Sequence, residues 1–256
     1  MPQPRIAIAP FLVSCPRVIT LGVRAAVSDY SAEEKGLLAS AGRIFFPTPR
    51  FAKIFEAAGK DTFPNAFTYG LRKSRQAQEA LFRVGGWPHP RARVYFGRQK
   101  ASIVPDFRFP FLAMGPNVSD RPRLIENTPQ LADATGEFNP LIIREKLEYD
   151  ERFLLVFVNF ECIATLQEVP GATAPPVAFS RPTATDLPPS AAGFRHTLSN
   201  LLRSFRINDI AVEIGLSATA DAQVLSLVRP PLWWRTPGGT ANRHDLIAGL
   251  IREGRL

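Results

Sequence analysis

The segment from Ile44 to Pro90 constrains the fold more than any other part of the chain, because it sets several short elements between clear stop signals. An apolar strand ends at Pro47, and the helix that follows is expected to end at Gly59. A Phe-Pro turn then leads into a second expected helix, Leu71–Val84, which closes at Gly85-Gly86. This order of strand, helix, turn and helix predicts a small α/β unit followed by a further domain.

Composition places the chain among globular proteins that can bury a substantial core. It has 256 residues, of which 45% are hydrophobic. No run of about 18 apolar residues occurs, so the sequence predicts no membrane-spanning helix. The two cysteines, Cys15 and Cys162, are far apart and form no metal-ligand spacing. A reducing, cytoplasmic location is therefore the expectation.

Positive charge is concentrated near the N-terminus. The formal net charge is +8, with +10 on residues 1–100, −5 on residues 101–190 and +3 on residues 191–256. Such a basic region favours an anionic partner, either a nucleotide or an acidic peptide. An arginine-rich composition also arises without any partner. The alternative that these charges are only solvated therefore stays open. No motif typical of nucleic-acid binding occurs, which makes nucleic acid the least favoured partner.

The remaining sequence predicts mainly strands. Ile6–Phe11 predicts a first strand, and Ser31 with Glu34 three residues later predicts a helix start. Phe153–Val158 is wholly apolar, as in a strand buried on both faces. Pro170–Pro189 is rich in Pro, Ala and Thr and is expected to form an irregular loop or lid. The other expected strands are Arg91–Phe96, Phe107–Ala113, Leu141–Leu147, Arg152–Asn159, Glu161–Val169, Ile210–Leu216 and Gln223–Val228, and the expected helices are Ser190–Phe205 and His244–Glu253.

The order of these segments resembles the ATP-grasp superfamily, in particular its RimK-like proteins. In those proteins a Phe-Pro turn, a basic helix and a Gly-x-Pro-x-Pro ending lead from a small domain into two ATP-binding lobes, as Phe63-Pro64 and Gly86–Pro90 do here. The resemblance implies an α+β fold with ATP-grasp architecture and an N-terminal small α/β domain. It implies residues 1–65 for that domain, 66–140 for a linker helix and the first lobe, and 141–256 for the second lobe.

ATP-grasp ligases use ATP and Mg²⁺ to activate a carboxylate for attack by an amine, so the resemblance implies those cofactors and an amino acid or acidic peptide as substrate. Such a site needs cations on the phosphates, a loop with free N–H groups and oxygen ligands for the metal. Lys73 and Arg75 match the first phosphate-binding position. The second, normally a lysine, holds Met114, and of the Gly-rich loop only Ser119 remains.

The hinge that holds adenine in the family does so through backbone groups, so its side chains are hardly restricted. By the resemblance, this hinge corresponds here to Arg144, Glu145, Lys146 and Leu147. Asp150 follows it and would lie near the ribose. The resemblance therefore implies that this part of a nucleotide site is retained.

The metal-binding end is the most altered part of the expected site. Glu213 stands where the family has an acid, but Ser226 replaces the second glutamate and Val228 replaces the asparagine. Glu168 stands where the family has an arginine. A hydroxyl and an isopropyl group cannot hold Mg²⁺ as a carboxylate and an amide do.

These replacements predict a catalytically impaired site, and two interpretations stay open. One is an ATP-dependent carboxylate–amine ligase, or an impaired relative, that binds nucleotide through Arg75, Glu145 and Asp150. The other is a non-enzymatic module that holds an anionic ligand or a partner protein. Zinc chemistry finds no support, because the three histidines are far apart and lack metal-ligand spacing.

Overall fold

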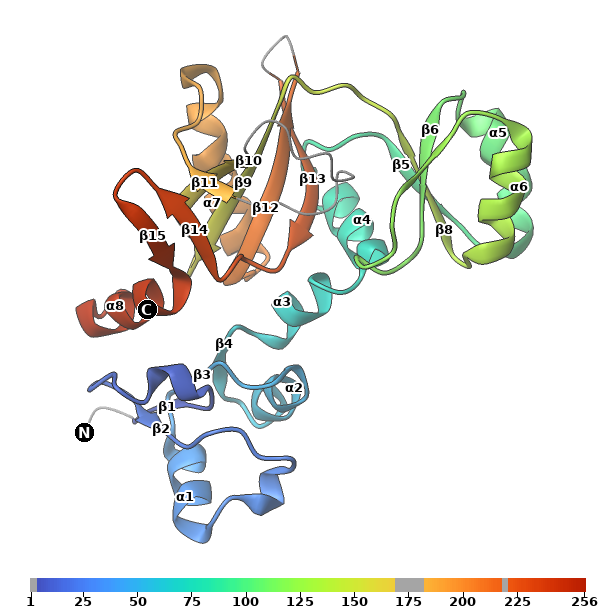
Figure 1. Cartoon of the computed structure of the whole chain (residues 1–256). Coiled ribbons are helices and arrows are strands. Elements are labelled where there is room, and N and C mark those ends of the chain that lie inside the picture. The colour runs from blue at the N-terminus through green and yellow to red at the C-terminus, as the bar shows by residue number, and fades with distance from the viewer. Residues whose placement is uncertain (1–3, 169–181, 218–220) are drawn as a thin grey trace.

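The strands assemble into three separate sheets, which mark out an N-terminal domain and two lobes (Figure 1). The computed structural model describes residues 4–168, 182–217 and 221–256. Residues 170–181 of the expected Pro170–Pro189 loop lie outside the described residues, so that part of the prediction stays open. The prediction of an irregular loop is wrong for residues 182–184, which pair as a strand.

The N-terminal domain is built on a parallel sheet with the strand order β2-β1-β3-β4. Its first helix begins at the predicted capping box: the Ser31 hydroxyl accepts from the Glu34 N–H at 3.1 Å, and the Glu34 carboxylate accepts from the Ser31 N–H at 2.7 Å. The first strand is shorter than expected, because a 3₁₀ turn begins at Pro10. The elements are β1 Arg5–Ala7, β2 Ile19–Thr20, α1 Ala32–Ser40, β3 Arg43–Phe45, α2 Pro49–Ala57 and β4 Asp61–Phe63.

Two short helices, α3 Ala66–Leu71 and α4 Arg75–Val84, connect this domain to the first lobe. The sequence predicted a single helix over Leu71–Val84. The chain breaks instead at Ser74, whose hydroxyl caps α4 by accepting from the Ala77 N–H at 3.1 Å. The break brings the start of α4 against the loop that follows β6 (Phe111–Met114), because the first N–H groups of α4 donate to the Pro116 carbonyl in that loop.

The first lobe is an antiparallel sheet with the order β5-β8-β6-β7, packed against α5 and α6 (Figure 1). The strand Leu141–Glu145 pairs with β5 and β6, so it belongs here and not to the second lobe, where the expected bound at residue 141 placed it. The predicted Phe107–Ala113 strand starts only after Pro110, which cannot donate to a ladder. The elements are β5 Ala92–Tyr95, α5 Ile103–Asp106, β6 Phe111–Met114, β7 Arg123–Ile125, α6 Thr128–Glu137 (missed from the sequence) and β8 Leu141–Glu145.

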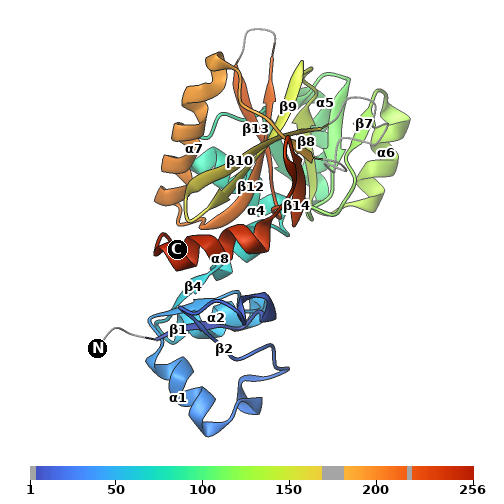
Figure 2. The ribbon, with the colours of Figure 1, turned by 60° about the vertical axis from the view of Figure 1, so that its left-hand side comes forward.

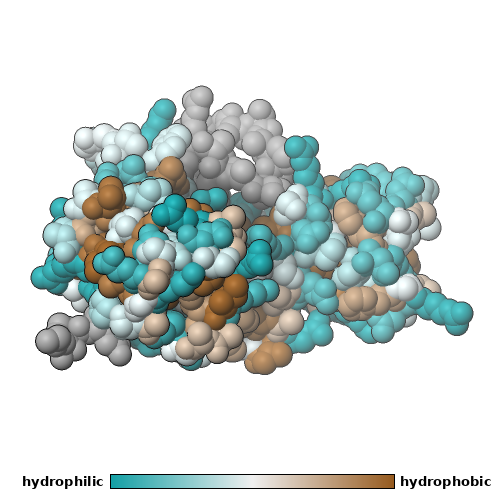
Figure 3. Space-filling view, turned by 90° about the horizontal axis from the view of Figure 1, so that it is seen from below, coloured by the Kyte–Doolittle hydropathy of each residue, from teal (hydrophilic) through white to brown (hydrophobic). Residues whose placement is uncertain are grey.

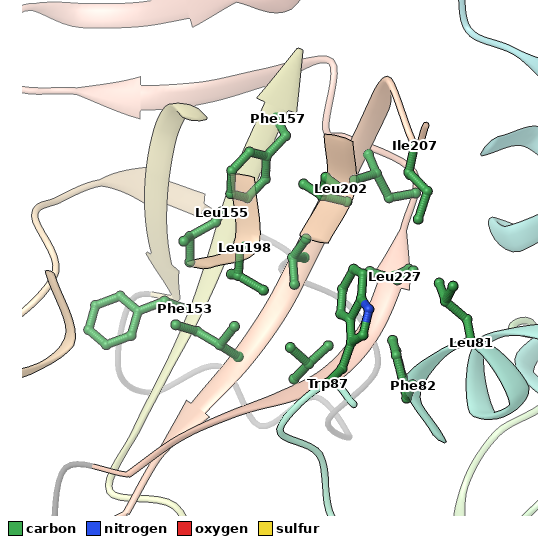
Figure 4. Close-up of a cluster of buried hydrophobic side chains, with 14 of the residues drawn as sticks. Leu81, Phe82, Trp87, Phe153, Leu155, Phe157, Leu198, Leu202, Ile207 and Leu227 are labelled. Carbon is green, nitrogen blue, oxygen red and sulfur yellow. The ribbon is translucent and has the colours of Figure 1, made fainter. Parts of the chain in front are cut away.

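The second lobe is a larger sheet with the order β13-β12-β9-β10-β11-β14-β15. Its main core lies between β9 and α7, where Phe153 and Phe157 pack with Leu198 and Leu202, and Trp87 joins them from the segment after α4 (Figure 4). The elements are β9 Glu151–Val158, β10 Glu161–Glu168, β11 Pro182–Ala184, α7 Ala192–Ser204, β12 Asp209–Leu216, β13 Ala222–Val228, β14 Trp233–Thr236, β15 Gly239–Asn242 and α8 Arg243–Glu253.

Helix α8 lies between the second lobe and the N-terminal domain and joins them (Figure 2). Its apolar face shares a buried cluster with Phe45 and Phe63 of the N-terminal sheet. An ion network crosses the same joint: the carboxylate of Asp209, the first residue of β12, is fully buried and pairs with Arg72 and Arg243. Three parts of the chain that are distant in sequence therefore meet at one carboxylate.

The surface on the side of the N-terminal domain carries hydrophobic residues in separate groups among hydrophilic ones (Figure 3). None of the helices in the described ranges is long and apolar enough to cross a membrane. The first lobe stands apart at one side of this view, so the space between the lobes is the natural place to look for a binding site.

Candidate functional site

A cavity of about 340 Å³ lies where the two lobes face each other. Its walls come from α4, from β6 and β8 of the first lobe, from the connection after β8, and from β9, β12 and β13 of the second lobe. Lys73, Ser119 and Asp150 are exposed and do not line it. The predicted site residues that do line it are Arg75, Met114, Arg144, Glu145, Lys146, Leu147, Glu213 and Ser226.

Most of the cavity wall is apolar. Met114 is only 2% exposed, so the position that the family resemblance assigns to a phosphate-binding lysine is part of a hydrophobic surface. Apolar walls with a few polar groups are typical of sites that bind small molecules. The other apolar lining residues are Pro90, Leu112, Val118, Pro122, Leu147, Leu225 and Val228.

Arg75 lines the cavity, but its guanidinium holds the loop that follows β6. It donates to the backbone carbonyls of Gly115, Asn117, Val118 and Asp120 at 2.8–3.2 Å. Burial lowers the pKa of the guanidinium to about 10, so it stays charged at neutral pH. The expectation that Arg75 binds phosphate stays a prediction, and a phosphate would have to compete with these backbone carbonyls for its donors.

Three N–H groups of the same loop are also in use. The Val118 N–H donates to the Lys73 carbonyl at 3.0 Å, the Asn117 N–H donates to the Asp120 carboxylate at 2.8 Å, and the Asp120 N–H donates to the Asn117 carbonyl at 3.1 Å. A loop that cradles phosphates needs such N–H groups free to face the ligand. The loop around Ser119 is closed on itself and on α4 instead.

Buried polar contacts that the sequence reasoning missed fix the inner wall. The Gln78 amide donates to the Leu227 carbonyl at 2.6 Å and accepts from the Leu227 N–H at 2.9 Å, which ties α4 to β13. Arg144 pairs with the buried Glu79 and donates to the Leu225 carbonyl at 2.7 Å. Polar residues on the buried face of an amphipathic helix were the available signal for Gln78 and Glu79.

The expected hinge borders the cavity. Glu145 is anchored by two contacts with Arg91: its N–H donates to the Arg91 carbonyl at 3.0 Å, and its carboxylate accepts from the Arg91 N–H at 2.7 Å. Lys146 pairs with Glu148 at 2.6 Å. The exposed Asp150 donates its N–H to the Leu216 carbonyl at 2.9 Å and does not line the cavity, and its place near the ribose stays a prediction.

The expected metal-binding end holds an ion pair. Glu213 lies directly opposite Ser226 in the β12–β13 ladder, and Arg152 of β9 lies opposite Gly215, two residues further along β12. The period of two therefore gives these three side chains the same face of the sheet. Oε1 of Glu213 accepts from the Arg152 guanidinium, and Oε2 accepts from the Ser226 hydroxyl at 2.7 Å.

This donor set does not fit Mg²⁺. The ion requires several oxygen ligands in octahedral geometry, whereas both carboxylate oxygens of Glu213 are engaged and a guanidinium lies beside them. Within residues 4–168, 182–217 and 221–256, no group of three or more His, Cys, Asp or Glu could hold a metal ion. Glu213 and Ser226 lie opposite each other in the ladder, and their assignment to the metal-binding end, with Ser226 as a degenerate position, stays a prediction. Arg152 was missed because only the strand register brings it to Glu213.

Tyr149 forms a further part of the wall. Its ring packs over Gly215 so closely that a Cβ at this glycine would lie 2.5 Å from it. Its hydroxyl donates to Oε1 of Gln223 at 2.8 Å. Burial raises the pKa of Tyr149 to about 12, so the side chain is a neutral hydrogen-bonding phenol at physiological pH.

Solved structures with a similar architecture include ATP-grasp proteins. A RimK-domain ATP-grasp protein from Sphaerobacter thermophilus matches with a TM-score of 0.62 and 14% identity over 98% of both chains. D-Alanine–D-alanine ligase from Bacillus anthracis, complexed with ATP, matches with a TM-score of 0.64 and 9% identity over 89% of this chain and 86% of that one. N5-Carboxyaminoimidazole ribonucleotide synthetase from Thermotoga maritima matches with a TM-score of 0.62 and 15% identity over 88% of this chain. The chain has the ATP-grasp fold, as the sequence predicted.

No protein-family profile and no curated protein matches the chain. It spans 61% of the length of the Thermotoga maritima synthetase and 63% of a second N5-carboxyaminoimidazole ribonucleotide synthetase, which was crystallised with ADP. Likeness at these identities defines the fold, and what the chain binds or catalyses depends on its own side chains.

Proposed function

We propose that this ATP-grasp-fold chain binds an adenine nucleoside or nucleotide in the cavity between its lobes, and that it is catalytically impaired as a carboxylate–amine ligase. The observation that carries the proposal is the saturation of Glu213, whose two carboxylate oxygens are taken by Arg152 and Ser226. Phosphoryl transfer depends on positioning and on neutralising charge. Because Glu213 is paired with Arg152, its charge is no longer available to neutralise or position a reacting group.

Adenine binding is supported by the shape and chemistry of the cavity. Its volume of about 340 Å³ and its apolar walls suit a planar ring. The chain from Lys146 to Glu148 borders it, where the family resemblance places backbone contacts to adenine. Fold neighbours were crystallised with ADP or ATP. The part of the site that needs no particular side chain is thus the part that is retained.

Loss of turnover is supported by the partners of the cationic side chains on the cavity wall. Each one already has an anionic or carbonyl partner within the protein. Removing one preorganised donor commonly lowers a rate by about 10²–10³, so turnover is expected to fall by on the order of 10⁴ when several are lost, even without additivity. The pairs are Arg75 with the loop carbonyls, Arg144 with Glu79, Lys146 with Glu148, and Arg152 with Glu213.

For a second ligand we propose an amino acid or an acidic peptide, which the basic N-terminal region would favour. One fold neighbour, the ligase PsnB, was crystallised with its precursor peptide. For the compartment we propose the cytoplasm, because Cys15 and Cys162 are both free thiols, as is usual where the environment is reducing.

Binding is tested by thermal unfolding with adenosine, AMP, ADP or ATP. A ligand that binds the native state raises Tm by mass action. Leu112→Trp, which fills the cavity, is expected to abolish the shift, whereas Leu232→Trp on an exposed residue outside the cavity is expected to keep it. An absence of any shift in the wild type, or an equal shift in the folded Leu112→Trp protein, would contradict the proposed site.

Turnover is tested by release of ADP or phosphate from ATP and Mg²⁺ with a panel of amino acids and acidic peptides. We expect no ligase-like rate with any of them. A rate near about 1 s⁻¹, which is low for an enzyme but ordinary, would refute the impaired assignment and restore a working ligase.

A further inference from the structure

The acid at the end of the cavity is neutralised by the protein itself. We infer that the adenine ligand binds without a divalent metal, with the Arg152 guanidinium held against Glu213 where ATP-grasp ligases would place the ion. We infer also that weakly charged ligands, adenosine and AMP, bind more tightly than ADP and ATP. This inference rests on the proposed function and narrows its class of ligand.

Arg152 is fixed in place by the sheet. Strands β9 and β12 pair without interruption from Glu151 to Val158, so the backbone that carries Arg152 cannot withdraw from Glu213. The side chain of Glu213 is 11% exposed and that of Arg152 is 33% exposed. A divalent ion would have to displace the guanidinium from a largely buried carboxylate, and two like charges would then share the space.

Every cationic side chain on the described part of the cavity wall has a partner within the protein, and Lys146 shares its charge with the exposed Glu148. Four cationic and three anionic side chains line it, and the buried Glu79 stands directly behind Arg144. The wall is therefore close to neutral. ATP-grasp ligases wrap phosphates with the loop in this position. In this chain the Asp120 carboxylate and three N–H groups of the loop form hydrogen bonds within the protein instead. Each added phosphate brings negative charge that neither a metal nor a side chain offsets.

Calorimetric titration of the wild-type protein with adenosine, AMP, ADP and ATP tests the order of affinities. Each titration is run with excess Mg²⁺ and again with EDTA. We expect the Kd of each ligand to change by less than about twofold between the two conditions, and AMP to bind at least about tenfold more tightly than ATP. In a metal-dependent ATP site, the Kd of ATP would rise strongly when EDTA replaces Mg²⁺, and ATP would bind more tightly than AMP.

A second arm uses Mn²⁺ alone, measured by electron paramagnetic resonance, and needs no nucleotide. The double variant Arg152→Gln with Ser226→Glu removes the guanidinium and sets two carboxylates opposite each other at Glu213 and position 226. It is expected to bind Mn²⁺, whereas the wild type is not. Arg93→Gln, which removes an exposed ion pair with Asp106, is the control and is expected to behave as the wild type.

The outcomes separate this inference from the proposed function. Tighter binding of ATP than of AMP in Mg²⁺, or Mn²⁺ binding by the wild type, overturns the metal-free site while the adenine site stands. A double variant that is folded by circular dichroism yet binds no Mn²⁺ overturns the placement of Arg152 at the metal position. If no adenine compound binds the wild type with Mg²⁺ or with EDTA, the proposed function fails and this ligand class fails with it.

Discussion

Two carboxylates on β12, Asp209 and Glu213, are both held by arginines, but their surroundings differ. Asp209 has no exposed surface and accepts from Arg72 and Arg243. Glu213 borders the cavity and accepts from Arg152 and a serine hydroxyl. The strand thus carries one acid at the joint between the domains and another at the binding cavity.

The two acids differ in what their partners join. Arg72 follows α3 and Arg243 begins α8, so Asp209 joins β12 to two helical segments that no strand pairing holds against it. The partners of Glu213 lie on β9 and β13, which the backbone already pairs with β12. An ion pair between strands already held by a ladder adds little to the fold. Its effect is expected on the ligand, because it decides the charge that faces the cavity.

The largest expected effect is that of Asp209→Ala. The substitution leaves two buried arginines without their acid and should lower the free energy of unfolding by about 3–5 kcal/mol. Urea denaturation measures the loss. Asp61→Ala is the matched control, because Asp61 pairs with Arg43 at the surface at 2.6 Å and should cost less than about 1 kcal/mol. If Asp209→Ala and Asp61→Ala lowered the free energy of unfolding equally, Asp209 would not have the structural role that distinguishes it from Glu213.

Gly215→Ala comes next and probes the cavity side of the same strand. The new Cβ would collide with the Tyr149 ring, so the ring must move, at a cost of about 1–3 kcal/mol. The displaced ring is expected to weaken adenine binding as well. Gly36→Ala, in the open middle of α1, is the control and should stabilise the protein by about 0.5–1 kcal/mol. A Gly215→Ala protein with unchanged stability and affinity would show that this wall is not rigid.

Glu213→Gln should have a smaller effect on folding, about 1 kcal/mol, because the amide keeps a hydrogen-bonding group beside Ser226 and the ladders on both sides remain. The same urea measurement applies. Its effect on ligand affinity should exceed its effect on stability, since the change alters the charge at the cavity. A loss of stability as large as that of Asp209→Ala would remove the distinction between the two acids.

The last effect appears only at alkaline pH, and each region offers a tyrosine to report it. Burial raises the pKa of Tyr69, at the joint, and of Tyr149, at the cavity, to about 12. A pKa that is higher in the folded state than the usual value of about 10 contributes stability that is complete below about pH 10 and is lost as the pH rises through about 12. The free energy of unfolding should therefore fall over this range, and less so in Tyr69→Phe and Tyr149→Phe.

Saturating AMP sharpens this measurement. A ligand in the cavity covers Tyr149 and leaves Tyr69 in its own contact with the Pro47 carbonyl. Spectrophotometric titration of the two single variants should therefore show a ligand-dependent pKa only where Tyr149 remains. A shift of Tyr69 alone would place the ligand at the domain joint.

The sequence carried enough information for the architecture, because strands and caps are local. The Ser31–Glu34 capping box formed as predicted, and the fold is the one that the order of segments resembled. The break between α3 and α4 was missed, because Ser74 was read as a helix residue and is a cap. The strand Leu141–Glu145 was assigned to the second lobe but pairs with β5 and β6 of the first. The local sequence pattern does not encode which distant strands a strand pairs with.

The site was predicted as a set of positions but not as a set of contacts. Eight of its expected residues do line one cavity. The direction of the Arg75 guanidinium depends on the shape of a loop, and the meeting of Arg152 with Glu213 depends on a register between strands. Both are tertiary facts, so the sequence could show that phosphate and metal ligands were replaced but not what the remaining charges do.

The hydrogen bonds from Arg75 to the loop after β6 affect which residues of this chain can be substituted during evolution. The groups it holds are backbone carbonyls, which every amino acid supplies. The side chains of Asn117 and Ser119, which do not line the cavity, are therefore open to drift. Arg75 is not, since a lysine lacks the planar fork that reaches several acceptors. Gly115 is restricted too, because a Cβ there would collide with Asp120. Descendants of this chain should thus diverge in the loop and keep its arginine and glycine.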